Sequence, residues 1–276
     1  MLSSQEKICT MKTNIPLLPR PLNLRESRKY LDFNPQRFRV VTRKEEVLFL
    51  GGMFSLNKRQ WGNRFPLDGF RAYYPEYPGH SNNLSMNLAD VHFRDFVRSI
   101  VEEVRSSLGK VSIVGHSLGS LVALEVARQC PDKVKFVCMI AAAPPKGVGL
   151  PKSLVKRMVK PYYLRALFGH PFRLLADDAI LVKDGSNAEI QAESGHILRE
   201  VSLGIPAPKV NTLSCHVAMI VTCDDGFVPF DTQMETVQLL GVKEHIRVRG
   251  GHFSFCQNGY ARETISVVTN LLNRNK

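Results

Sequence analysis

The stretch VSIVGHSLGSLVA, residues 111–123, decides how the rest of the chain is interpreted. A β-branched apolar run ends at Val114 and a helix-like apolar pattern begins at Leu118, so a strand is predicted to pass directly into a helix. Between them lies the pattern G-x-S-x-G, formed by Gly115, Ser117 and Gly119. Such a junction strains the serine backbone and presents its hydroxyl at the C-terminal edge of a sheet, while the glycines leave room for the turn. Ser117 is therefore the first candidate nucleophile.

Backbone amides near Ser117 offer a place where negative charge could develop. The helix that begins at Leu118 has unpaired N–H groups at its N-terminus. A glycine-rich exit, GGMFS at residues 51–55, follows a predicted buried strand at residues 46–50. Glycines let backbone amides approach a ligand, although a plain tight turn has the same composition. If this loop forms an oxyanion hole, the Met53 amide is the first candidate, with Gly52 as its neighbour.

A serine hydroxyl is a poor nucleophile until a base takes its proton, so a base is needed at the same sheet edge. His252 meets this requirement because it follows a predicted strand at residues 244–249 and the preceding glycines let the loop bend. The imidazole in turn needs a carboxylate that fixes its tautomer. The loop after a predicted strand at residues 216–222 offers Asp224 and Asp225, and both stay open on local sequence.

The remaining pattern predicts an α/β fold with a mostly parallel, twisted β-sheet flanked by helices. Apolar strand-like runs alternate with helical patterns, which indicates right-handed crossovers. The strongest amphipathic helix is predicted at residues 91–108, and a C-terminal helix at residues 262–272. The further strands are expected at residues 37–43, 70–74 and 135–140.

Four segments follow from this pattern. Residues 1–36 are polar and punctuated by proline, and we assign them to an N-terminal extension. Residues 37–146 and 209–276 form the two parts of the core. Residues 147–208 contain only short helical pieces broken by proline and glycine, so we expect a helical lid inserted over the C-terminal edge of the sheet.

Composition limits the class of protein. Hydrophobic residues make up 44% and charged residues 22% of the chain, which is ordinary for a soluble globular protein. The net charge of +12 raises nucleic-acid binding as a hypothesis. The chain has no zinc-finger spacing, no RNP-like motif and no basic helix with base-reading residues, so no nucleic-acid partner is expected.

The six cysteines form no C-x-x-C pair. Cys138 and Cys223 fall in apolar, strand-like runs, and we expect buried free thiols rather than a disulfide framework or a metal site. No cofactor is expected. The first thirty residues lack the continuous apolar segment of a secretory signal, which favours a cytoplasmic protein, and their basic composition leaves a weak transit peptide as the alternative.

Four motifs together resemble signatures of the α/β-hydrolase fold superfamily. They are VSIVGHSLGSLVALEVA at residues 111–127, PEYPGHS at 75–81, CDDGFVP at 223–229 and GGHFS at 250–254. The resemblance covers most of the two core segments and implies a serine nucleophile on this fold, without specifying a substrate. It also implies the chain order Ser, Asp, His.

The resemblance assigns further roles. In family members the acid commonly precedes x-x-V-P, and this spacing selects Asp225. Family oxyanion holes use the amide after the nucleophile, here Leu118, and one from the first strand-exit loop, here Met53. Gly52, His116 and Phe253 are adjacent to these positions, and we expect them to contact the substrate.

Two departures from the family pattern stand out. The oxyanion loop reads Gly51-Gly52 where His-Gly is usual, and Glu76 replaces the usual aspartate before the Pro-Gly turn. We interpret Glu76 as structural. A serine rather than an aspartate at the elbow argues against haloalkane dehalogenase or epoxide hydrolase chemistry.

The resemblance implies a carboxylic-ester hydrolase of the esterase, lipase or lysophospholipase kind, acting on a small-molecule ester through an acyl-enzyme. An acyl thioesterase is the close alternative, because GGHFS also resembles type II thioesterases of polyketide and peptide assembly lines. From another class, a slow or non-hydrolysing ligand receptor is the alternative, since some members of this fold have that role.

The predicted lid offers the one clue to a partner. Lys152, Lys156 and Lys160 recur every fourth residue beside the apolar residues Leu154, Val155, Met158 and Val159. A solvated helix packed on the core explains this pattern. The more specific hypothesis is a lid that rests on an anionic membrane surface or an acyl carrier, with apolar residues lining an acyl tunnel.

Overall fold

The computed structural model describes residues 44–62, 69–81, 83–151, 155–156, 159–183, 186 and 188–276. They belong to one compact unit, Lys44–Lys276. The predicted N-terminal extension and the predicted strand at residues 37–43 lie outside the described residues.

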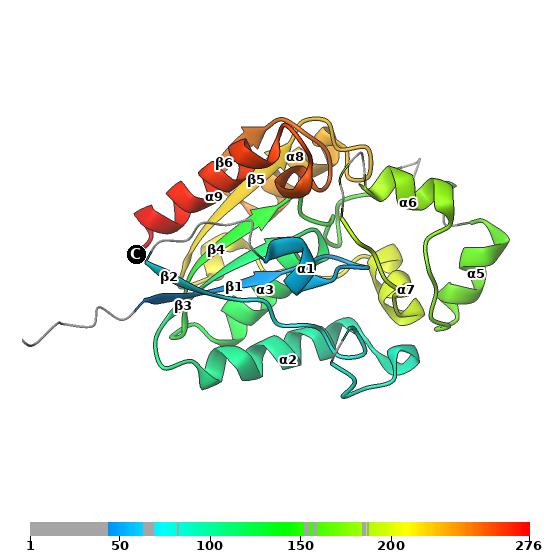
Figure 1. Ribbon diagram of the computed structural model, residues 1–276, viewed down its shortest axis with the longest axis horizontal. Coiled ribbons are helices and arrows are strands. Elements are labelled where there is room, and N and C mark those ends of the chain that lie inside the picture. Colours follow the sequence, from blue (N-terminus) through cyan, green and yellow to red (C-terminus); the bar gives the residue numbers. More distant parts are fainter. Residues whose placement is uncertain are drawn as a thin grey trace, which may run out of the picture. The chain divides into compact units, whose positions relative to one another are not determined.

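Six parallel strands form a single sheet in the order β2-β1-β3-β4-β5-β6 (Figure 1). The central strand β3 is buried at all six of its residues, because it has strands on both sides and helices on both faces. The predicted α/β class with a mostly parallel sheet is confirmed. The strands are β1 (Glu45–Leu50), β2 (Phe70–Tyr73), β3 (Val111–His116), β4 (Val134–Ile140), β5 (His216–Thr222) and β6 (Glu244–Val248).

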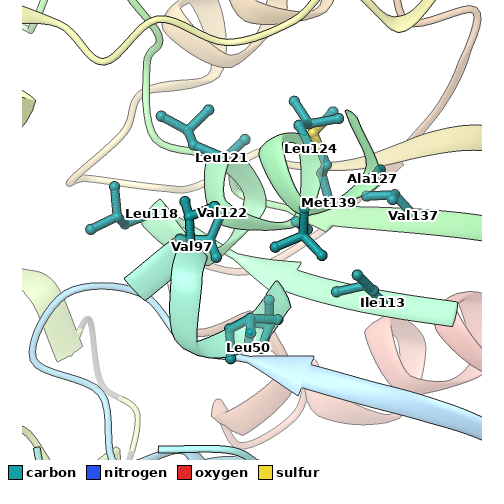
Figure 2. Packing of buried hydrophobic residues seen from close by; sticks show 14 of the residues in the cluster. Leu50, Val97, Ile113, Leu118, Leu121, Val122, Leu124, Ala127, Val137 and Met139 are labelled. Atoms are coloured by element: carbon teal, nitrogen blue, oxygen red, sulfur yellow. The ribbon is translucent and has the colours of Figure 1, made fainter. Parts of the chain in front are cut away.

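Helices cover both faces of this sheet. Apolar side chains of α2, α3 and α8 pack with Ile113 and Met139 on one face, whereas α1 and α9 pack with Val114 and Cys138 on the other. Figure 2 shows Leu121, among others on α3, in the first of these layers. The alternation along each strand follows the period of two that sends neighbouring side chains to opposite faces. The helices are α1 (Asn57–Trp61), α2 (Phe93–Ser106), α3 (Leu118–Gln129), α8 (Phe230–Leu240) and α9 (Ala261–Arg274).

The described part of the segment between β4 and β5 includes the helices α5 (Pro161–Leu167), α6 (Ala176–Lys183) and α7 (Gly195–Leu203). They lie together beyond one end of the sheet in Figure 1. Within the described part of residues 147–208 there is no strand, only isolated antiparallel bridges such as Phe172 with Glu193. We call residues 147–208 the insertion.

Two details differ from the sequence predictions. Leu108 was expected on the apolar face of the helix at residues 91–108, but α2 ends at Ser106 and Leu108 is 82% exposed. Cys223 was expected to be buried, but β5 ends one residue earlier and the thiol is exposed. In both cases the element stops before the apolar run does. The described cysteines are free thiols, and none of the described helices is long and apolar enough to span a membrane.

Candidate active site

Ser117 occupies the junction between β3 and α3 with a strained backbone. Its φ of 52° and ψ of −121° are unusual for a residue other than glycine. Its N–H donates to the Ile140 carbonyl at 2.9 Å, which anchors the turn to β4. The side chain is only 6% exposed. The predicted strand-to-helix geometry is therefore present at this serine.

The glycines of the pattern allow the close packing that this turn requires. A Cβ on Gly115 would lie 2.4 Å from the Gly119 carbonyl oxygen, and one on Gly119 would lie 2.4 Å from the Gly51 carbonyl oxygen. Gly52 faces the serine itself, since a Cβ there would be 2.7 Å from Ser117 Cβ. Backbone atoms on both sides leave no space for a methyl group at these positions.

His252 lies after β6, and its Nδ1 is 2.8 Å from Oδ2 of Asp225. The two side chains are 2% and 0% exposed. This contact places Nε2 on the opposite edge of the imidazole. Ser117 and His252 line the same cavity. Both are described residues, and their side chains are not hydrogen-bonded to each other. Such contacts are often long in unliganded sites and tighten with substrate bound.

The Asp225 carboxylate is held by several donors. Its Oδ1 accepts the amides of Phe227 at 2.8 Å and Val228 at 2.7 Å, and its Oδ2 also accepts from the Thr222 hydroxyl at 3.1 Å. The neighbouring Asp224 is exposed and accepts the Gly250 amide instead. Of the two aspartates that the sequence offered, Asp225 is the one that contacts the imidazole.

Two backbone amides near Ser117 are placed to receive a negative charge. Leu118 is the first residue of α3, so its N–H has no carbonyl acceptor within the helix. The Met53 amide has no acceptor among the described residues. Both residues line the cavity together with Ser117. This arrangement is suited to stabilising an oxyanion.

His116 does not contact the cavity, which corrects the expectation that it touches substrate. Its side chain is fully buried, and its Nε2 lies 2.8 Å from the His252 carbonyl oxygen. Burial lowers the pKa of His116 well below its usual 6.5, and the nearby His252 lowers that pKa further. The ring centre of His116 lies 4.7 Å from that of His252, so the two imidazoles pack against each other. Phe253, by contrast, does line the cavity.

The cavity beside Ser117 is predominantly apolar. Its walls come from the β1 exit, the β4 exit, the Asp225 loop and the insertion. Among the described residues, no group of three His, Cys, Asp or Glu side chains is arranged to hold a metal ion. The arrangement is suited to an apolar ligand. Its apolar lining includes Phe54, Leu150, Tyr163, Phe172, Leu174, Leu198, Val201 and Phe227.

Only part of the lysine pattern in the insertion falls within the described residues. Lys152 lies outside the described residues. Lys156 is exposed, whereas Lys160 places its Nζ 2.9 Å from the buried carboxylate of Asp178. Val155 and Val159 are 45% and 60% exposed and do not line the cavity, whereas Leu154 and Met158 lie outside the described residues. The helix α5 begins after them, at Pro161, and its buried residue Tyr163 lines the cavity instead.

Sequence reasoning missed the residues that support the site. Gln233 on α8 is fully buried and donates to Thr222 and to the Asp225 carboxylate, at 3.3 Å for the latter. Glu193 in the insertion is also fully buried and accepts the Phe54 amide. A glutamine on the buried face of the helix after the Asp225 loop was a usable signal for Gln233. Glu76 accepts the first amides of α1, which agrees with a structural interpretation.

Comparison with known proteins identifies the family. The profile of the alpha/beta hydrolase family matches residues 47–258. A provisionally named esterase/lipase 2 of Mycoplasma genitalium is 30% identical over 117 residues, which cover 38% of this chain and 40% of that protein. A provisionally named alcohol acetyltransferase of Wickerhamomyces anomalus is 23% identical over 252 residues, which cover 85% of this chain and 67% of the relative. The chain thus spans well under two thirds of the first relative.

A solved structure agrees with this match at the level of the fold. The crystal structure of a pyrethroid hydrolase superposes with a TM-score of 0.67 at 15% identity, over 84% of this chain and 98% of that one. The family profile spans most of the chain, from β1 to beyond His252. The chain, with its six-stranded parallel sheet and its serine at the β3–α3 junction, therefore belongs to the alpha/beta hydrolase family.

Proposed function

We propose that this family member hydrolyses carboxylic esters, with Ser117 as nucleophile, His252 as general base and Asp225 as the orienting acid. The proposal rests mainly on the buried contact between His252 Nδ1 and Asp225 Oδ2, made in a cavity that Ser117 also lines. A carboxylate on Nδ1 leaves Nε2 as the proton acceptor, which is the tautomer that activates a serine. The strained backbone of Ser117 supports the same role.

The first half of the reaction forms an acyl-enzyme. Ser117 Oγ attacks the ester carbonyl carbon while His252 Nε2 takes the hydroxyl proton. The carbonyl oxygen becomes an oxyanion, which the amides of Met53 and Leu118 stabilise. The tetrahedral intermediate then collapses, the bond to the alkoxy group breaks, and His252 returns the proton to the leaving alcohol.

The second half releases the acid. A water molecule attacks the acyl-enzyme carbonyl and gives one proton to His252. Collapse of the second intermediate breaks the bond to Ser117 Oγ, and the imidazole returns the proton to that oxygen. Asp225 stays ionised and stabilises the imidazolium at each step.

The apolar lining of the cavity supports a substrate with an apolar acyl or alkyl group that binds there. Aromatic and aliphatic side chains from the core and from the insertion form most of its lining. We propose that the insertion serves as a lid over this cavity. Apolar enclosure favours medium-chain esters over short polar ones, because each buried methylene contributes about 0.8 kcal/mol.

Hydrolysis of p-nitrophenyl acyl esters by wild type and Ser117→Ala tests the proposal. We expect wild-type turnover to rise from acetyl to medium acyl chains and the variant to lose it by a factor on the order of a thousand or more. Parallel assays on acyl-CoA separate an esterase from a thioesterase. A single product burst without turnover would instead favour the receptor role.

Acyl transfer to an alcohol is the second candidate. The relative from Wickerhamomyces anomalus, which is described as an alcohol acetyltransferase, aligns with 85% of this chain. In that reaction an alcohol replaces water in the second half, and an apolar cavity favours binding of an alcohol with an apolar chain. Product analysis with added ethanol separates the two, because transfer yields an ethyl ester and hydrolysis yields the free acid.

A further inference from the structure

We infer that Glu193 of the insertion is a positioning residue for the Met53 amide, a role that rests on the proposed function. Glu193 is fully buried, in contrast to most glutamates in proteins. A buried carboxylate is costly unless hydrogen bonds or an opposite charge compensate it. The groups that compensate Glu193 come from the loop that contains Met53 and from the turn that contains His80.

The Glu193 carboxylate joins three segments of the chain. Its Oε2 accepts the Phe54 amide at 3.1 Å, and its Oε1 accepts the Ser194 amide at 2.8 Å. The same Oε1 lies 3.1 Å from Nε2 of His80. One carboxylate therefore connects the β1 exit loop, the Pro-Gly turn after β2 and the start of α7.

The residue that Glu193 binds is itself strained. Phe54 has a φ of 63°, in the left-handed region that residues other than glycine rarely occupy. Such a conformation persists only where the surroundings hold it. Glu193 holds the Phe54 N–H, and the Gln191 amide donates to the Phe54 carbonyl at 2.9 Å. Both partners of this strained residue belong to the insertion.

Phe54 directly follows Met53, so the bond from Glu193 to the Phe54 N–H fixes the Met53–Phe54 peptide, which is the next peptide after the one that carries the Met53 N–H. The Glu193 backbone is fixed in its turn by two hydrogen bonds with Phe172, at 2.8 and 2.9 Å. The rings of Phe54 and Phe172 pack edge to face, with their centres 5.4 Å apart, and both line the cavity. The insertion thus shapes the cavity wall and holds the proposed oxyanion loop through the same residues.

The side chain that faces the buried Glu193 carboxylate is the imidazole of His80. Its Nδ1 lies 3.0 Å from the Pro78 carbonyl oxygen, which makes Nδ1 a donor and directs Nε2 to Glu193. Burial by itself lowers the pKa of His80, but the charge and hydrogen bond of Glu193, with the Pro78 carbonyl and Glu76, raise that pKa above 6.5 overall. The other titratable neighbour is Tyr77, whose ring centre is 6.3 Å away.

Steady-state kinetics on a p-nitrophenyl ester test this role with Glu193→Ala, Glu193→Gln and a control. The control is Glu235→Gln, which changes an exposed carboxylate on α8. Removing an oxyanion donor costs about 100- to 1,000-fold in kcat, so misplacing one is expected to cost about 10- to 100-fold in Glu193→Ala, with KM within about threefold of wild type. Glutamine can still accept the Phe54 amide but lacks the charge that faces His80, so Glu193→Gln is expected to fall below wild type in kcat and to retain more kcat than alanine.

The melting temperature, the steady-state constants and the rate of fluorophosphonate labelling together test the inference. Melting temperature shows whether each variant is folded. If Glu193→Ala does not fold, Glu193→Gln takes its place, and the inference predicts a lower kcat with a KM close to that of wild type. A folded Glu193→Ala or Glu193→Gln with wild-type kcat would overturn the inference, as would a change in KM alone. Labelling by a fluorophosphonate separates the two proposals: a wild type that is not labelled at Ser117 overturns both, whereas equal labelling rates in wild type and Glu193→Ala overturn only the role of Glu193.

Discussion

The sheet and the insertion are stabilised in different ways. The sheet buries every residue of β3 and packs alternate side chains into two apolar layers. The described part of the insertion includes the short helices α5, α6 and α7 and exposes large apolar residues, such as Phe168 at 82% and Ile180 at 69%. It is attached through particular polar contacts, among them those of Glu193 and Gln191. Under the proposed mechanism, the core would position the reacting groups and the insertion would shape the substrate side of the cavity.

The largest expected effect is on the core side of the site. Asp225→Asn leaves an amide opposite His252 Nδ1 and favours the wrong tautomer, so kcat is expected to fall by about 10⁴-fold. Asp224→Asn is the matched control, because asparagine can still accept the Gly250 amide. If Asp224→Asn lost as much kcat as Asp225→Asn, the assignment of Asp225 alone as the orienting acid would be wrong.

Two phenylalanines compare the stability of the regions directly. Phe136 on β4 is fully buried, so Phe136→Ala is expected to lower the free energy of unfolding by about 3–5 kcal/mol. Phe168→Ala in the insertion changes an exposed side chain and is expected to stay within about 0.5 kcal/mol. Urea unfolding measures both. Equal losses would mean that Phe168 stabilises the fold as much as Phe136 does, which would contradict the difference between the two regions.

A third pair of variants concerns the elbow. A Cβ on Gly119 would meet the carbonyl oxygens of Gly51 at 2.4 Å and Leu50 at 2.7 Å, so Gly119→Ala is expected to cost about 1–3 kcal/mol or more. Gly109→Ala is the control, because nothing lies within 4 Å of its Cβ position. Thermal unfolding of the two variants should differ clearly, and similar melting temperatures would show that the junction can relax.

The smallest expected effect is a pH dependence of the attachment between core and insertion. The pKa of His80 is raised in the folded protein, so its ion pair with Glu193 stabilises the fold fully below pH 6.5 and is lost as pH rises through the raised value. The difference in unfolding free energy between wild type and His80→Gln should therefore shrink from pH 6 to pH 9. A constant or growing difference over that range would contradict the pairing.

The same contrast explains what the sequence could predict. Strands such as Val134–Ile140 are apolar runs with local turn signals, and a serine between a strand and a helix is a local pattern as well. The pairing of Glu193 with His80 joins residues far apart in the chain, and although His80 lies in the PEYPGHS motif, nothing in the local sequence identifies Glu193 as its partner. Where helices stop is also set by tertiary contacts, which is why Leu108 was misplaced. Local periodicity predicts the sheet, whereas the insertion depends on individual long-range contacts.

The central claim is that Ser117 is an activated nucleophile, and mass spectrometry after fluorophosphonate treatment tests it most directly. We predict one covalent adduct per chain, mapped to the peptide that contains Ser117, absent in Ser117→Ala and formed far more slowly in His252→Ala. A wild-type protein that remains unmodified, or an adduct on another residue, would contradict the claim.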